Sequence, residues 1–349
     1  MKRNIYIIYS LIIISITTKS QDHPKSYICY QTKDSIIIDG NINELSWEKA
    51  SWADPFIDIE GEKKAKPYLE TKVKMIWNSK YLYIAAELEE NHIWANLKQR
   101  DTVIFYDNDF EVFIDPDGDN HEYYELEINA FGTEWDLFLQ RPYRDIVKPN
   151  TDWDIKGLRS AIKVFGTINN PSDKDEKWTV EIAIPWGSLR GSAFPNRIPM
   201  QGEQWRMNFS RVQWITDVVD NRYVKKRDPN TKKVLPEQNW VWSPQGKINM
   251  HMPEMWGYVQ FSQKYVGESS DVFNPDPDWN IKMMLMQVYY LQKEFFKLND
   301  KYAANEGELD IKPSTDLIIE VNDKQFVAYL KNPDGKKIYI NNESKIWHE

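Results

Sequence analysis

Hydrophobic and polar residues alternate in short runs over most of positions 36–262, which is the pattern of half-buried β-strands. Residues 72–77 and 81–88 form two such runs around the turn-forming Asn78-Ser79-Lys80, so they predict a hairpin. Further strands are predicted at 36–38, 109–115, 123–129, 131–139, 157–165, 178–184, 204–214 and 257–261. The charged, turn-rich residues 217–236 predict a long exposed loop. No helical periodicity separates these runs, so the pattern predicts a mainly β protein built as an antiparallel β-sandwich.

The pattern changes after Asn274-Pro275-Asp276-Pro277. Apolar residues then recur every three or four positions and predict one stripe of a long helix: Met284, Val288, Leu291, Phe295, Leu298 and Tyr302. Strands are predicted at 317–321, 326–329 and 337–340. We therefore predict a β-sandwich at 21–270 and a small α+β appendage at 271–349. The appendage either docks a protein partner or caps the sandwich, and the sequence leaves both open.

The first 20 residues have the pattern of a signal peptide. Lys2 and Arg3 precede an apolar run at 5–16, and Thr18 and Ser20 suit cleavage before Gln21. The run is short for a transmembrane span, although a retained anchor is the alternative. No later segment is predicted to cross a membrane. We expect an exported protein, periplasmic or extracellular, with the cell surface included.

The net charge and the cysteine content exclude some classes of ligand and metal site. The net charge is −9 and no basic patch follows the chain, which excludes a nucleic-acid ligand. Cys29 is the only cysteine, so an internal disulfide and a thiolate metal site are excluded. The 15 Trp and 19 Tyr suit either large β-sheet cores or flat surfaces on which sugar rings stack.

The predicted hairpin at 109–129 carries the candidate chemistry. Glu111 stands in a run that otherwise reads as a buried strand, where an unpaired carboxylate costs several kcal/mol. On the second strand Tyr123, Glu125, Glu127 and Asn129 alternate and so share one polar, aromatic face. We predict that this hairpin forms the floor of a binding site.

Five segments resemble, in order, the family 9 carbohydrate-binding modules over about residues 33–262. They are 36–40 with Trp47, 73–77 with 81–84, 109–115, 178–186 and 256–259. The resemblance implies a β-sandwich shared by extracellular sugar-binding and haem-binding modules. It also implies a non-catalytic role in carbohydrate binding that supports polysaccharide capture or breakdown.

The resemblance also implies a set of sugar-binding residues: Tyr106, Glu111, Glu127, Asn129, Arg211 and Trp214. The family has Trp at the position assigned to Tyr106 and Arg at the position assigned to Glu127. We therefore hypothesise that charge is exchanged across the site, with Arg211 facing Glu127. Arg211 and Trp214 point to opposite faces of a regular strand, so their convergence requires a bulge or a strand end between them.

Several alternatives compete with sugar binding. A glycoside hydrolase would pair Glu111 with Glu125 or Glu127 as two catalytic carboxylates, although no hydrolase signature is present. A docking protein with a decayed sugar site, or a buried salt-bridge cluster in place of the site, would also fit the departures from the family pattern. A haem module would need axial ligands from scattered residues. Those available are His92, His121, His251, Met250 and Met252.

Asp115, Asp117 and Asp119 alternate with Pro116 and Gly118 in the predicted turn of the central hairpin. Oxygen-rich turns of this kind hold Ca²⁺, although the helix-loop-helix calcium pattern is absent. The turn is therefore either a calcium site or a solvated hairpin turn. No other cofactor is predicted.

Overall fold

The computed structural model describes residues 23–145, 150–189, 197–311, 316–322 and 324–349. The predicted signal peptide at 1–20 lies outside the described residues, which begin at His23. Twelve strands form one large sheet. Along the path of the sheet they are β7 (Glu134–Leu139), β6 (Tyr123–Asn129), β5 (Asp109–Asp115), β10 (Gln204–Gln213), β14 (Gly257–Tyr265), β1 (Ser26–Gln31), β3 (Thr71–Trp77), β4 (Tyr81–Glu89), β9 (Lys177–Pro185) and β8 (Arg159–Phe165). Beside this path, β13 (Gln238–Val241) pairs with β10, and β2 (Ile57–Asp58) pairs with β13.

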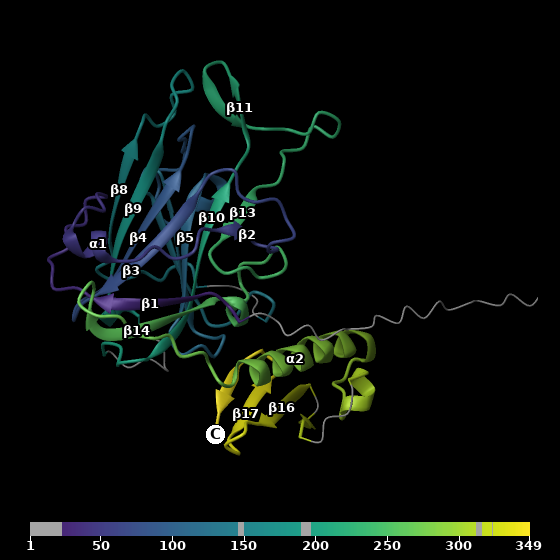
Figure 1. Ribbon diagram of the computed structural model, residues 1–349. Helices are drawn as coiled ribbons and strands as arrows, with labels where there is room; N and C mark the ends of the chain where they lie inside the picture. Colours follow the sequence, from purple (N-terminus) through teal and green to yellow (C-terminus); the bar gives the residue numbers. More distant parts are fainter. Residues whose placement is uncertain (1–22, 146–149, 190–196, 312–315, 323) are drawn as a thin grey trace, which may run out of the picture.

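This sheet curls on itself so that β5 and β10 lie across from β3, β4 and β9 (Figure 1). The result is the predicted mainly β, sandwich-like class. Most neighbours are antiparallel, as predicted, and β1 alone among the strands of the described sheet runs parallel to its neighbours β14 and β3. The parallel β1 joins the two layers into one continuous sheet.

Aromatic side chains fill the space between the layers. Trp77, Trp178, Trp205 and Trp242 are each no more than 1% exposed. Trp77 satisfies its indole N–H by donating to the carbonyls of Cys29 and Ser262, both at 3.1 Å. Because a large sandwich has a wide core, much of the high tryptophan content serves packing.

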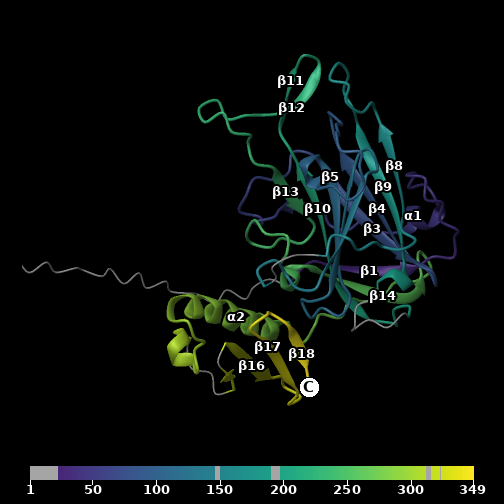
Figure 2. The same cartoon turned by 180° about the vertical axis from the view of Figure 1, so that it is seen from behind.

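Two local predictions are wrong. Residues 36–38 form no strand; instead the backbone N–H groups of Asp39 and Gly40 donate to the Glu181 carboxylate at 3.1 and 2.8 Å. Gly40 has φ +83°, and a Cβ there would lie 2.6 Å from the Lys163 nitrogen, so glycine is required. Residues 217–236 are not all loop, because β11 (Thr216–Val219) and β12 (Arg222–Lys225) form a hairpin that projects from the sandwich (Figure 2).

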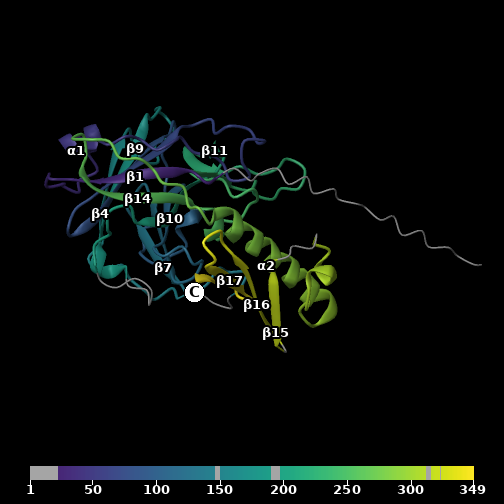
Figure 3. The same cartoon turned by 60° about the horizontal axis from the view of Figure 1, so that its bottom comes forward.

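The C-terminal part has its own apolar core. The helix α2 (Trp279–Asn299) packs on a four-stranded sheet, as Figure 3 shows. The strands are β15 (Ile318–Asn322), β16 (Gln325–Lys331), β17 (Lys337–Asn341) and β18 (Ile346–His348). The predicted helix is present, but its predicted stripe is partly wrong, because Met284 is 48% and Leu298 83% exposed. Leu285, Met286 and Tyr289 are buried instead. A second α-helix, the short α1 (Leu45–Lys49), lies earlier in the chain.

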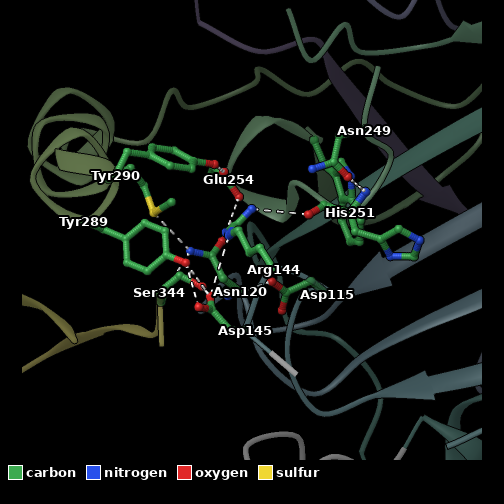
Figure 4. A network of polar contacts seen from close by, with 12 residues as sticks. Asp115, Asn120, Arg144, Asp145, Asn249, His251, Glu254, Tyr289, Tyr290 and Ser344 are labelled. Atoms are coloured by element: carbon green, nitrogen blue, oxygen red, sulfur yellow. Dashed lines mark hydrogen bonds and ion pairs between the residues drawn. The ribbon is translucent and has the colours of Figure 1, made fainter. Parts of the chain in front are cut away.

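This appendage packs against the sandwich through polar contacts (Figure 4). Asp145 accepts hydrogen bonds from Tyr289 Oη at 2.7 Å, Lys293 Nζ at 2.8 Å and Ser344 Oγ at 2.8 Å. Tyr290 Oη donates to Glu254 at 2.5 Å. The appendage therefore covers one end of the sandwich, while a protein partner for residues 271–349 stays a prediction. Among the described residues, no helix combines the length and apolarity needed to span a membrane.

Candidate functional site

A cavity of about 360 Å³ opens on the face of β5, β6 and β7 that points away from the core. Its floor comes from β5 and β6, with β7 on one side and β13 on the other, and the loops that carry Tyr143 and residues 248–251 complete its edge. Acidic, aromatic and other polar side chains line much of the cavity: Phe105, Glu111, Glu125, Glu127, Trp135, Tyr143, Glu237, Asn239, Asn249 and His251.

Three glutamates form the floor. Glu111 on β5 pairs directly with Glu127 on β6, and Glu125 lies two residues earlier on the same face of β6. Their exposed fractions are 4% for Glu111 and Glu125 and 2% for Glu127. Burial raises the pKa of Glu111 to about 7. Burial, with Glu111 close by, also raises the pKa values of Glu125 and Glu127. These carboxyls can therefore hold protons near neutral pH and donate as well as accept hydrogen bonds.

Aromatic rings stand beside this floor. Trp135 on β7 is the cross-strand partner of Glu127, so its ring starts next to that carboxylate. Phe105, in the 3-10 helix η1 (Ile104–Tyr106), donates its backbone N–H to Glu127 Oε2 at 2.9 Å. Tyr143 contributes a third ring and is 41% exposed. Flat apolar surfaces thus meet a row of carboxyl groups in one hollow.

His251 forms part of the rim and is fixed from several sides. Its Nδ1 lies 2.9 Å from Tyr123 Oη, and the Tyr143 ring packs edge-on against it with centroids 4.2 Å apart. Burial, with Arg144 close by, lowers the pKa of His251 to about 3, so its imidazole is neutral. Its Nε2 lies 4.0 Å from Glu125, but with a neutral imidazole this contact is not an ion pair.

Arg144 connects this rim to the appendage. Its guanidinium donates to the His251 carbonyl at 3.2 Å and to Glu254 Oε2 at 2.9 Å (Figure 4). Glu254 in turn accepts the hydrogen bond from Tyr290 of α2. The helix therefore supports the cavity rim through two intervening side chains.

The structure brings only some of the predicted site residues together. Glu111 and Glu127 line the cavity, whereas Tyr106 and Trp214 do not. Tyr106 is 55% exposed, and Trp214 is 8% exposed and donates its indole N–H to the Phe105 carbonyl at 2.9 Å. Lys225 Nζ lies 3.3 Å from the Trp214 ring centroid and 5.4 Å from that of Tyr106. β10 ends at Gln213, so the strand end that was predicted between Arg211 and Trp214 is present.

The hypothesis that Arg211 faces Glu127 is wrong. Arg211 pairs with Phe110 of β5, whose side chain is in the core, and it is 1% exposed. Its Nη2 forms an ion pair with Glu90 at 3.0 Å. Asn129 does not line the cavity either. Its side chain holds the backbone, because Nδ2 donates to the Leu97 carbonyl and Oδ1 accepts two backbone N–H groups.

Sequence reasoning missed Phe105, Trp135, Tyr143, Asn239, Asn249 and His251. For Phe105 a signal was present. Phe105 directly precedes Tyr106, so the predicted aromatic position missed the cavity by one residue. Trp135 could have been found by extending the hairpin register from Glu127. The loop residues come from distant parts of the chain and left no local signal.

The predicted calcium turn is a separate cluster. Asp115, Asp117 and Asp119 each offer an oxygen, and these oxygens lie within 4.8 Å of one another. Asp115 is fully buried and accepts the backbone N–H groups of Gly118 and Asn120, both at 3.0 Å, so the turn is not simply solvated. Asp119 already pairs with Lys345 of the appendage at 3.0 Å. Calcium at this turn stays a prediction.

The fold is a curled β-sandwich whose outer face carries the acidic, aromatic-lined cavity. A sequence model of the carbohydrate family 9 binding domain-like family matches residues 38–259. The chain belongs to this family, which confirms the resemblance of its strand motifs, the mainly β fold class and the expectation of a carbohydrate-binding module.

Three known proteins are similar to parts of the chain. An exoglucanase, XynX, of Acetivibrio thermocellus is 25% identical over 153 residues, which are 44% of this chain and 12% of the exoglucanase. A candidate carbohydrate-binding protein of Bacteroides uniformis aligns with 68% of this chain and all of its own, at TM-score 0.47 and 15% identity. A family 9 carbohydrate-binding module of Caldicellulosiruptor kristjanssonii, solved with cellotriose, aligns with 71% of this chain and all of its own, at TM-score 0.43 and 15% identity.

Proposed function

We propose that the cavity over β5, β6 and β7 binds the end of a glycan without cleaving it. The observation that carries this proposal is the meeting of three aromatic side chains with a row of buried glutamates in one hollow of about 360 Å³. Sugar rings need both surfaces, because their C–H faces stack on aromatic planes while their hydroxyls take directional hydrogen bonds.

The lining suggests a division of roles. Trp135 and Tyr143 would contact the apolar face of a sugar ring. Glu111 and Glu127 would take its hydroxyl groups, and Asn239 on the opposite rim would complete the contacts. Carboxyl oxygens accept hydrogen bonds from hydroxyls with or without a bound proton, which suits an uncharged sugar. Glucose and cellotriose, present in two of the aligned Caldicellulosiruptor structures, are the first ligands to test.

Titration calorimetry with glucose and cellotriose tests the proposal. Trp135→Ala removes the ring that faces Glu127, so it should weaken binding by about 1–3 kcal/mol, that is, roughly 5- to 150-fold. Tyr106→Ala is the matched control, because its ring is exposed and outside the cavity. Equal loss in both variants, or binding that survives Trp135→Ala unchanged, would contradict the assignment of the cavity.

The same samples separate binding from hydrolysis. In the proposed role, incubation with cellotriose releases no reducing sugar. Release that is lost in Glu111→Gln would instead assign a glycosidase, in which two carboxylates flank the cleaved bond.

We further propose that the chain is exported to the periplasm or the cell surface, where glycans are encountered. The pattern of residues 1–20 and the family membership support this. Mass spectrometry of the protein from fractionated cells should find a mature chain beginning at Gln21. A full-length chain in the cytosol would contradict the proposal.

A further inference from the structure

The cavity floor carries more negative groups than its surroundings balance. Asp109, Glu111, Glu125 and Glu127 all point to one face of β5 and β6, and none is more than 4% exposed. Within the described part of the chain, no Lys or Arg forms an ion pair with any of the four. Four buried carboxyl groups at this spacing cannot all be charged unless a cation joins them.

Several of their oxygens are also unused. Asp109 Oδ2, Glu111 Oε2 and Glu125 Oε2 are buried and have no hydrogen-bond partner among the described residues. The other Asp109 oxygen accepts the Val212 N–H at 3.2 Å, and Glu127 Oε2 accepts the Phe105 N–H. Backbone donors thus hold two of the carboxyl groups in place while neighbouring oxygens remain free, which points to a missing ligand.

The spacing of these oxygens matches one ion. Asp109, Glu111 and Glu127 each offer an oxygen, and the three lie within 4.8 Å of one another. Calcium binds oxygens at about 2.3–2.6 Å, so ligands on opposite sides of the ion lie about 5 Å apart. Carboxylate oxygens alone, with no histidine or thiolate in the trio, are the ligand set of a hard cation.

We propose that Asp109, Glu111 and Glu127 bind a divalent cation, best matched by Ca²⁺, at the floor of the cavity. Three carboxylates leave coordination positions of Ca²⁺ free, because it takes six to eight oxygens. Glu111 and Glu127 line the cavity, so these positions face the space where a ligand enters. Resting on the proposed function, this arrangement lets sugar hydroxyls complete the coordination of the ion.

Calorimetry with CaCl₂ alone, on the chain stripped of metal at pH 7, tests the site without any glycan. We expect one ion to bind at this floor and to release protons, because the carboxyls that bind it lose theirs. The heat should therefore change with the ionisation enthalpy of the buffer. Binding should be lost in Glu111→Gln and Asp109→Asn, which keep the side-chain shape and remove repulsion.

Asp117→Asn is the matched control, because it removes a carboxylate from the turn cluster two residues beyond the end of β5. If calcium binding is lost in Asp117→Asn and survives Glu111→Gln, the ion belongs to the turn and the proposal fails. Absence of calcium binding also overturns it. Near-ultraviolet circular dichroism of each variant shows whether the fold is kept, and a calcium-dependent rise in melting temperature gives a second readout.

Glycan titrations in excess EDTA and in Ca²⁺ separate this inference from the proposed function. Cellotriose binding that needs Ca²⁺ supports both. Equal cellotriose binding in EDTA and Ca²⁺ contradicts a cation that contacts the sugar and leaves the glycan site intact. Calcium binding that maps to Glu111 without any glycan binding supports the cation site and contradicts the glycan function.

Discussion

Replacing Arg211 by Met should destabilise the fold rather than remove a sugar contact. The Arg211 guanidinium is 1% exposed and forms an ion pair with Glu90, whose side chain is 5% exposed. It also donates to Thr71 Oγ1 at 3.0 Å, to the Glu89 carbonyl at 2.8 Å and to Gln213 Oε1 at 2.9 Å. The variant leaves Glu90 buried without its cation.

Removing one partner of a buried ion pair costs about 3–5 kcal/mol, mostly because the remaining charge is uncompensated. At about 2–4 °C per kcal/mol for a domain of this size, the melting temperature should fall by roughly 6–20 °C. Urea unfolding gives the free energy directly. Lys25→Met is the matched control, because the Lys25–Asp54 pair at 2.7 Å is 36% and 62% exposed and should contribute at most about 1 kcal/mol.

Two further measurements sharpen this prediction. Adding Glu90→Gln to Arg211→Met should recover part of the lost stability, because the stranded charge is then removed. Cellotriose affinity, measured well below the melting temperature, should be unchanged in Arg211→Met. A variant as stable as Lys25→Met that no longer binds cellotriose would refute the reasoning and return Arg211 to the sugar site.

Three other predictions concern the rim, the appendage and a turn. The pKa of His251 is lowered to about 3, so the stability that its neutral ring contributes is present above pH 6.5 and is lost as the pH falls toward 3. Urea titrations should show that the free energy of unfolding falls less between pH 7 and pH 3 in His251→Phe than in the unchanged chain, by up to about 5 kcal/mol. Tyr290→Phe removes the hydrogen bond to Glu254, so it should cost about 1–3 kcal/mol and weaken cellotriose binding through Arg144, whereas an equal change in the half-buried Tyr329→Phe, which lies outside this network, would contradict this. Gly40→Ala places a Cβ 2.6 Å from Lys163 N at φ +83° and should cost more than about 1 kcal/mol in thermal unfolding; an unchanged melting temperature would contradict the strain.

The sequence predicted what local periodicity controls. Alternation places Glu111 and Glu127 on the outer face of their strands, and a short turn makes the strands neighbours, so these two residues meet as expected. The same alternation shows that Arg211 and Trp214 diverge. The family resemblance places Arg211 in the site, whereas the alternation places its side chain in the core.

What could not be predicted depends on contacts between distant segments. Glu90 becomes the partner of Arg211 only when the two layers of the curled sheet face each other. Tyr143 and His251 reach the cavity from loops 108 residues apart in the chain, and Arg144 links them to α2. Such pairings depend on strand order, including the parallel β1, which no local pattern specifies.

A crystal structure of the chain soaked with cellotriose tests the central claim most directly. The account predicts a sugar ring in the cavity, stacked on Trp135 and hydrogen-bonded to Glu111 or Glu127. Sugar bound instead at the exposed surface of Tyr106 and Lys225, or an empty cavity at a cellotriose concentration that saturates the protein in solution, would contradict it.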